Sequence, residues 1–116
     1  MAVTQFYLPP IQPDVVRNFV ADFSANLDTA ETIESATVAA EPAVLGGEGL
    51  TPVGSPVIGR VDARGRNFVA DLAGPCVLQV FRSGNAIGDY TITFQATTNA
   101  GQTPAATFGV AIAIRS

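Results

Sequence analysis

The chain has 116 residues and a formal net charge of −4, with 47% hydrophobic and only 14% charged residues. This size and hydrophobicity predict one domain with its own core and exclude a largely disordered chain. All six basic residues are arginine. An acidic chain of this kind is a poor match for a phosphate backbone, so we expect no nucleic-acid partner. No apolar stretch reaches the length of a membrane-spanning helix, so we expect no membrane partner either.

The absent residue types narrow the chemistry further. The chain contains no histidine and no tryptophan, and Cys76 is its single cysteine. Serine–histidine–aspartate, cysteine–histidine and histidine–zinc sites are therefore excluded, and an internal disulfide cannot form. Cys76 lies in the apolar run PCVLQV, where a small buried thiol is expected rather than a nucleophile. We expect no enzymatic activity, no metal and no cofactor.

Residues 1–14 are predicted to form an extended N-terminal arm, because the prolines at positions 9, 10 and 13 disfavour a helix. The arm is too hydrophobic to remain free in water. It can cover the domain's own core or dock on a neighbouring subunit, and both placements stay open. The segment lacks the features of a secretion signal, so we expect folding in a reducing cytoplasm. Its candidate partner-binding anchors are Phe6, Tyr7, Leu8 and Ile11.

Two segments after the arm show the alternation of half-buried strands. In residues 18–25, we expect Phe19, Ala21 and Phe23 to point inward, before a polar turn. Residues 32–40 carry β-branched residues and form the next predicted strand. A helix is the alternative there, since the glutamates and alanines tolerate one, but the β-branched residues favour a strand.

Residues 41–65 are the least regular region, because glycine and proline interrupt every short apolar run. We predict an irregular insertion here, with brief edge strands around residues 57–61. A loop of this kind on the rim of a domain is a natural place for partner contacts. Arg60 and Arg64 are expected either to stay solvated or to pair with an acidic neighbouring protein, and both are candidate partner-binding residues.

The C-terminal part predicts strands at residues 68–72 and 76–81 and a closing hairpin over residues 88–114. Tyr90 follows a Gly-Asp pair at the entry of the penultimate strand, as in many immunoglobulin-like domains. Its hydroxyl is expected to bond to nearby backbone. About seven strands joined by short turns predict an all-β fold, in which residues 15–116 form a single immunoglobulin-like β-sandwich.

The hexapeptide RNFVAD occurs twice, at residues 17–22 and 66–71. The flanking sequences share nothing, and repeat proteins need longer units. A duplication and two strands with the same local demands both remain as explanations. In either case, we expect Asp22 and Asp71 to point outward, where they can pair with Arg17 and Arg66 or with other arginines.

Two segments resemble small phage virion proteins of the fiber–tail adaptor type, which are short immunoglobulin-like domains. These segments are FVADFSANLDTAETIESATVAA and GDYTITFQATTNAGQT. The resemblance does not extend to residues 41–65, which are longer than the usual middle of that family. The matching positions are Asp22, Phe23, Asp28, Thr32, Ile33, Ser35, Tyr90, Ile92, Thr93, Thr97, Thr98 and Gly101.

The resemblance implies a non-enzymatic structural protein of a bacteriophage virion, assembled in the host cytoplasm, which links a fiber to the tail or connector. Its partners would be other virion proteins, contacted by the arm and the middle loop in a symmetric assembly of many copies. A capsid or tail decoration protein is one alternative. An immunoglobulin-like carbohydrate-binding or adhesion module is another, but it needs exposed aromatic rings, and the chain has no tryptophan and only two tyrosines.

Overall fold

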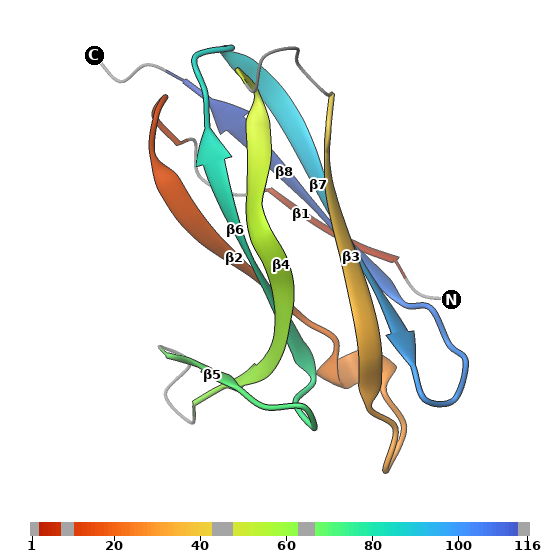
Figure 1. The fold of residues 1–116 in the computed structure, drawn as a ribbon. Coiled ribbons are helices and arrows are strands. Elements are labelled where there is room, and N and C mark those ends of the chain that lie inside the picture. The colour runs from red at the N-terminus through yellow and green to blue at the C-terminus, as the bar shows by residue number, and fades with distance from the viewer. Residues whose placement is uncertain (1–2, 8–10, 43–47, 63–66, 114–116) are drawn as a thin grey trace.

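The computed structural model describes residues 3–7, 11–42, 48–62 and 67–113, with the backbone alone for residues 3–7. Within these residues the chain forms eight strands and one short 3-10 helix. The strands form two four-stranded sheets that pack face to face as a β-sandwich (Figure 1). The structure therefore confirms the predicted all-β, sandwich-like class.

One sheet, here called sheet A, contains both the first and the last strand. β1 (Val3–Tyr7) runs parallel to β8 (Ala105–Ile112), and all other neighbouring strands of this sheet are antiparallel. For residues 32–40, a strand is predicted with a helix as the alternative. The structure has the strand β3 (Ile33–Glu41) there, so the prediction is confirmed. In spatial order, sheet A consists of β1 (Val3–Tyr7), β8 (Ala105–Ile112), β7 (Gly88–Thr98) and β3 (Ile33–Glu41).

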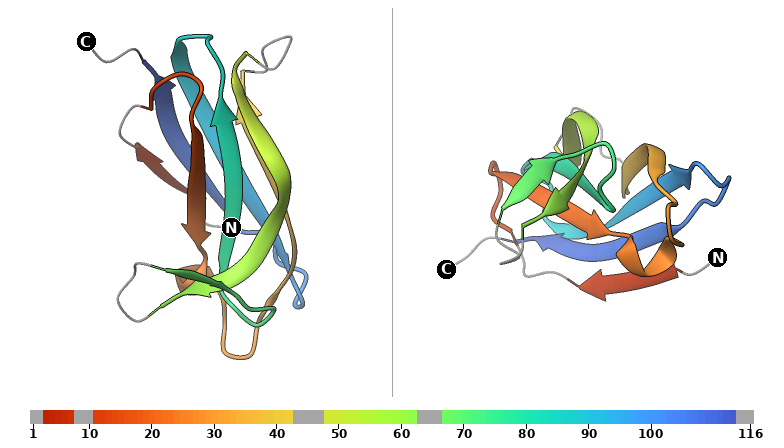
Figure 2. Two further views of the ribbon diagram at one scale, coloured as in Figure 1. Left: turned by 60° about the vertical axis from the view of Figure 1, so that its left-hand side comes forward. Right: turned by 90° about the horizontal axis from the view of Figure 1, so that it is seen from below.

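The other sheet, here called sheet B, is antiparallel throughout. The 3-10 helix η1 (Ser24–Asn26) follows its first strand, where the chain leaves sheet B for sheet A at one end of the sandwich (Figure 2). In spatial order, sheet B consists of β2 (Val16–Asp22), β6 (Cys76–Ser83), β4 (Leu50–Val61) and β5 (Phe68–Ala70).

Alternating side chains from both sheets meet in one core. Phe19 and Phe81 of sheet B contact each other edge to face, with ring centroids 5.6 Å apart. Phe94 and Phe108 of sheet A form a second such pair at 5.5 Å. Pairs of this geometry contribute about 0.5–1.5 kcal/mol each beyond the burial of their area. The three inward positions predicted in residues 18–25 are all buried, as expected.

Tyr90 fixes the corner at which the chain passes from β6 to β7. Its side chain lies in the core, with only 4% of the residue exposed. Its hydroxyl donates a 2.7 Å hydrogen bond to the carbonyl of Ala86, four residues upstream. The ring therefore anchors in the core while the hydroxyl holds the loop, which confirms the predicted role of this residue.

The N-terminal segment belongs to the sandwich wherever it is described. Its first part is β1, and Ile11 follows as a buried core residue that bonds to the end of β8. The N–H of Asp14 then donates to the carbonyl of Ser83 at 2.8 Å, and the N–H of Ser83 donates to Val15 at 2.9 Å. The segment thus crosses from sheet A to sheet B. Of the two predicted placements, the described residues adopt the one against the domain's own core.

The prediction of an irregular insertion over residues 41–65 is wrong for its second half. Leu50–Val61 forms β4, a single strand of 12 residues. A bulge between Val53 and Val57 accommodates the glycine and proline there, and Gly54 has a φ of 74°. The buried amide of Gln79 donates to the carbonyls of Val53 and Gly54, both at 3.2 Å, so the backbone released from the ladder stays bonded.

The two copies of RNFVAD lie at opposite edges of sheet B. The first ends β2, and the second, described from Asn67, forms β5. Asp22 Oδ1 accepts the N–H of Ser24 at 2.9 Å, and Asp71 Oδ1 accepts the N–H of Ala73 at 3.0 Å. Both aspartates therefore end a strand through the same kind of turn. This favours the explanation that the hexapeptide occurs twice because two strands have the same local structural requirements, rather than because of a duplication. This turn also ends the first predicted strand three residues early.

The replacement Tyr90→Phe removes the hydroxyl and leaves the ring in the core. The carbonyl of Ala86 then loses its donor, and we expect the free energy of unfolding to fall by about 1 kcal/mol. Urea denaturation measures this change, and its slope should stay constant because the buried surface is the same. The exposed neighbour variant Thr91→Val is the control, with an expected change below about 0.5 kcal/mol. Equal effects of the two variants would contradict the role assigned to the hydroxyl.

Candidate partner-binding site

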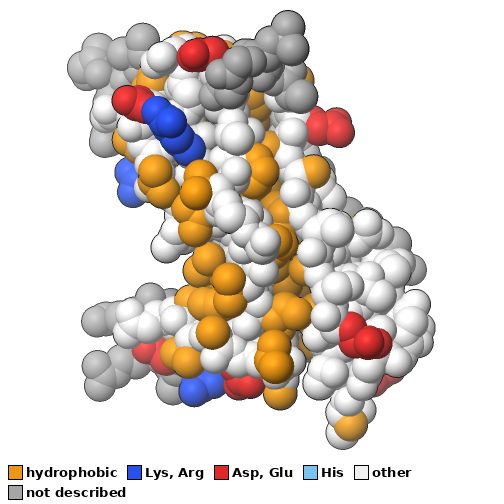
Figure 3. Space-filling model, in the orientation of Figure 1, with side chains coloured by type: hydrophobic (Ala, Val, Ile, Leu, Met, Phe, Trp, Pro, Cys, Tyr) orange, Lys and Arg blue, Asp and Glu red, His pale blue; other side chains and the backbone are white. Residues whose placement is uncertain are grey.

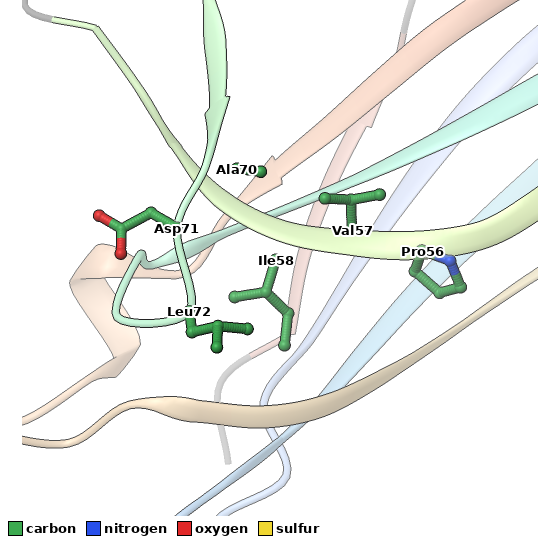
Figure 4. A pocket seen from close by; sticks show the side chains of 6 residues that line it. All are labelled: Pro56, Val57, Ile58, Ala70, Asp71 and Leu72. Carbon is green, nitrogen blue, oxygen red and sulfur yellow. The ribbon is translucent and has the colours of Figure 1, made fainter.

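A shallow groove with a volume of about 380 Å³ lies beside the short edge strand β5 (Figure 4). One wall comes from β4, and the other comes from the end of β5 and the turn that follows it. All lining residues except one aspartate are apolar. They are Pro56, Val57, Ile58, Ala70, Asp71 and Leu72.

Two glycines set the shape of this groove. A Cβ atom at Gly59 would lie 2.2 Å from the carbonyl oxygen of Val69 and 2.4 Å from the ring of Phe68. A Cβ atom at Gly74 would lie 2.0 Å from the carbonyl oxygen of Gly59. Any side chain at either position would push β5 or its turn away from β4. The close approach of the two walls therefore depends on glycine at both places.

The turn after β5 holds Leu72 out into solvent. The N–H of Asp71 donates to the carbonyl of Ile58 at 3.0 Å, and the N–H of Gly74 donates to the carbonyl of Asp71 at 2.9 Å. With the turn bonded on both sides, Leu72 is 86% exposed. An exposed leucine in a bonded turn can contact a partner with little ordering cost, because its backbone is already fixed.

The charged residues at the groove form a pair within the chain. Arg60 Nε lies 3.4 Å from Asp71 Oδ2, and the two side chains are 51% and 38% exposed. The predicted pairing of Asp71 with an arginine is thereby confirmed. An exposed pair of this kind contributes only about 0–1 kcal/mol, so either partner can exchange it for a contact to another protein.

The other residues predicted to bind partners do not gather at the groove. The backbones of Phe6 and Tyr7 pair with β8 in sheet A, on the other layer of the sandwich. Ile11 is buried with 8% exposed, so in this structure it anchors its own domain. Leu8 and Arg64 lie outside the described residues. Leu72 has no sequence signal beyond its place before a Gly-Pro turn, because its exposure depends on long-range bonds to β4.

Cys76 does not have the surroundings of a reactive thiol. It is unpaired and buried at the start of β6, with 2% exposed. Burial raises the pKa of the thiol, and the negative charge of the neighbouring Asp22 raises it further. Nucleophilic cysteines need a lowered pKa and an open approach. Cys76 is therefore a packing residue, as the sequence predicts.

The acidic turn before β3 has a structural role, because its carboxylate is bonded within the domain. Glu31 accepts the N–H of Asp28 at 2.9 Å and the hydroxyl of the buried Thr98. These bonds, the one from Thr98 foremost, lower the pKa of the Glu31 carboxyl. The carboxylate thus joins the turn to the end of β7. Among the described ranges, no three acidic or cysteine residues are grouped closely enough to hold a metal ion.

No protein-family model matches this chain, and no curated protein sequence matches it. In the part of the chain that the structure describes, no helix is long and apolar enough to cross a membrane. The surfaces described above are therefore the basis for a functional proposal.

Ser83 fastens the N-terminal segment, and its replacement tests whether that segment is part of the domain. Its buried hydroxyl donates to the carbonyl of Gln12 at 2.6 Å and accepts the N–H of Val15 at 3.0 Å. We expect Ser83→Ala to lower the free energy of unfolding by about 1–3 kcal/mol. Hydrogen exchange at Ile11 should also become faster. Ser35→Ala, at an exposed position of β3, is the control and should change neither quantity. Unprotected N-terminal amides in the unmodified protein would contradict this assignment.

The thiol of Cys76 should react slowly in the folded protein. Because its pKa is raised above the ordinary value of 9.0, the reactive thiolate is scarcer at pH 8 than in the unfolded chain. We expect alkylation by iodoacetamide to be at least about tenfold slower than in urea. The stability linked to this thiol is present below pH 9 and decreases as the pH rises through the raised pKa. Equal rates in the folded and unfolded states would overturn this prediction.

Proposed function

We propose that this protein is a non-enzymatic structural component of a bacteriophage virion, which joins a fiber to the tail or connector. The supporting observation is the groove beside β5, where apolar walls lie next to the exposed Leu72. The single titratable lining residue, Asp71, is paired with Arg60 and ends its own strand. A surface of this composition suits binding of a macromolecule through shape complementarity and burial of apolar area, rather than catalysis on a small substrate.

The fold that carries this surface is, in our proposal, immunoglobulin-like. Three features support this: the first strand pairs in parallel with the last, Tyr90 fixes the corner before the penultimate strand, and the two sheets share one core. A rigid sandwich of this type suits a connector, because it presents its rim loops without changing shape.

The sequence placed the contacts with other virion proteins on the arm and the middle loop. In this proposal they lie on the edge of sheet B instead. Ile11 and the backbone of β1 are engaged within the domain, so they offer little to a neighbour. The β4–β5 rim, with the groove and Leu72, is free among the described residues to make such contacts. Arg60 stays a partner-binding residue, because its pair with Asp71 is exposed and weak.

A carbohydrate-binding function has less support. Sugar stacking needs aromatic rings on the surface. Of the aromatic side chains that the structure describes, only Phe68 is not buried, and its ring packs over Gly59. The large apolar side chains that are exposed in the described part of the chain are valine, leucine and isoleucine, which do not stack on sugars. The surface therefore favours a protein partner.

The test is incorporation of the protein into particles. In a phage genome that carries this gene, we expect the protein to co-purify with intact virions by mass spectrometry. Leu72→Asp places a charge at the groove and should reduce its amount per particle at least about tenfold, since burying an unpaired carboxylate is costly. The fold should be unaffected, because Leu72 is 86% exposed.

Ile87→Asp is the matched control. Ile87 is also an exposed aliphatic residue, 53% accessible, but it lies in the loop at the opposite end of β6. This variant should enter particles at the level of the unmodified protein. Absence of the unmodified protein from purified virions would overturn the proposed function. Equal incorporation of both variants would overturn the role of the groove.

A further inference from the structure

The turn before β3 and the tip of the β7–β8 hairpin are fastened to each other at one end of the sandwich (Figure 1). Glu31 lies at the centre of this contact. Its Oε2 accepts the hydroxyl of the buried Thr98, and its Oε1 accepts the N–H of Asp28 at 2.9 Å. The hydroxyl of Thr98 in turn accepts the N–H groups of Ala100 at 3.3 Å and Gln102 at 3.1 Å. One carboxylate thus joins two segments that lie 67 residues apart in the sequence.

The donors in this contact cannot reverse their direction. A backbone N–H only donates, and both lone pairs of the Thr98 hydroxyl are used by N–H groups, so its proton must point to Glu31. A proton added to either oxygen of Glu31 therefore weakens an acceptor that its donor cannot replace. The contact has its full strength only with an ionised carboxylate. The lowered pKa of the Glu31 carboxyl agrees with this, since the bonds from Thr98 and Asp28 cause it.

The backbone of the turn is strained and set apart from the regular ladder of the sheet. Ala30 has a φ of 68°, a left-handed conformation that costs free energy in a residue with a Cβ atom. The β3–β7 ladder has an irregularity between Ile33 and Ser35, so the pair of Ile33 with Thr98 is separated from the regular rows that begin at Ser35. Release of the turn therefore does not require loss of the ladder.

We propose that Glu31 is an acid-released latch: as a carboxylate it holds the turn of residues 28–32 on the hairpin tip, and protonation lets the two separate while the rest of the sandwich stays folded. Because the pKa is lowered in the folded protein, the latch is complete above the ordinary value of 4.5 and is lost as the pH falls through the lowered value. The latch is thus closed at neutral pH and opens only in acid. This inference does not rest on the proposed virion role, because it concerns the stability of one end of the domain.

The titratable groups near the latch are all carboxyls. The hairpin tip, residues 98–104, and the segment of residues 23–27 before the turn contain no titratable side chain. The nearby carboxyls are those of Asp28 in the turn itself and Glu34 at the start of β3. Figure 3 shows acidic and no basic side chains at the lower right, where the turn and the hairpin tip lie. A variant of each glutamate therefore identifies the group that controls an acid transition at this end.

A pH titration of the full chain, followed by NMR, tests the latch. The side-chain carboxyl carbon of Glu31 should titrate below pH 4.5, and the amides of Asp28, Ala100 and Gln102 should shift with the same midpoint. Protection factors from hydrogen exchange should fall at least about threefold at these amides on protonation, because a bond to a charged group is lost. Protection at Phe94, in the core part of β7, should not change.

Glu31→Gln keeps the size of the side chain but removes its titration. The amides of Ala100 and Gln102 should therefore have the reduced protection at neutral pH as well, and they should not follow the acid transition. Glu34→Gln removes an exposed carboxyl and should leave the transition as it is in the unmodified protein. Thr98→Val removes the donor and should raise the pKa of Glu31 toward 4.5. If Thr98→Val does not fold, the comparison of Glu31→Gln with Glu34→Gln decides.

Three outcomes would overturn the proposal. One is a Glu31 carboxyl that titrates at or above pH 4.5 in the folded protein. Another is an acid transition of the hairpin amides that persists in Glu31→Gln or is lost equally in Glu34→Gln. The third is a loss of protection at Phe94 with the same midpoint, because the sandwich would then open as a whole.

Discussion

The packing of two inner sheet faces against each other is the constraint on which the rest of this structure depends. The single cysteine is unpaired, so no disulfide joins the sheets. Each sheet contributes one edge-to-face phenylalanine pair to a shared apolar core, and the packing of that core holds the sheets together. The buried polar side chains of Gln79, Ser83 and Tyr90 each donate a hydrogen bond to a backbone carbonyl, which offsets the cost of burying them. Each of the three fixes a place where the chain departs from a regular ladder. The core therefore determines both the strands and the loops beside them.

The parts of the fold that follow from local pattern could be predicted from the sequence. Alternation places Phe19 in the core, and the tyrosine behind a Gly-Asp pair predicts its own hydrogen bond. β4 could not be predicted in this way, because its glycines and prolines have the composition of a loop. What makes a strand of it is pairing with β6, and at the bulge the amide of Gln79, which is 26 and 25 residues away from the carbonyls that it binds. A contact of that range leaves no periodicity in the sequence.

The candidate site was less predictable than the fold. Arg60 lies at the groove, as a rim residue of the middle segment should, whereas Ile11 is a core residue that only resembles an exposed anchor. Hydrophobicity alone does not distinguish an apolar residue that packs in the core of its own domain from one that is exposed and able to bind a partner. The distinction comes from hydrogen bonds. The backbone of Ile11 is bonded to β8, and the turn that carries Leu72 is bonded so that its side chain points away.

Integration of the N-terminal segment has a consequence for how this domain can assemble. β1 covers the edge of β8 in sheet A, and the prolines at positions 52 and 56 lie in the part of β4 that β5 leaves unpaired. Proline removes a donor from an open edge and so discourages strand addition. Association through strand edges is thereby disfavoured at both places. The groove beside β5 offers a contact of another kind, which needs no added strand.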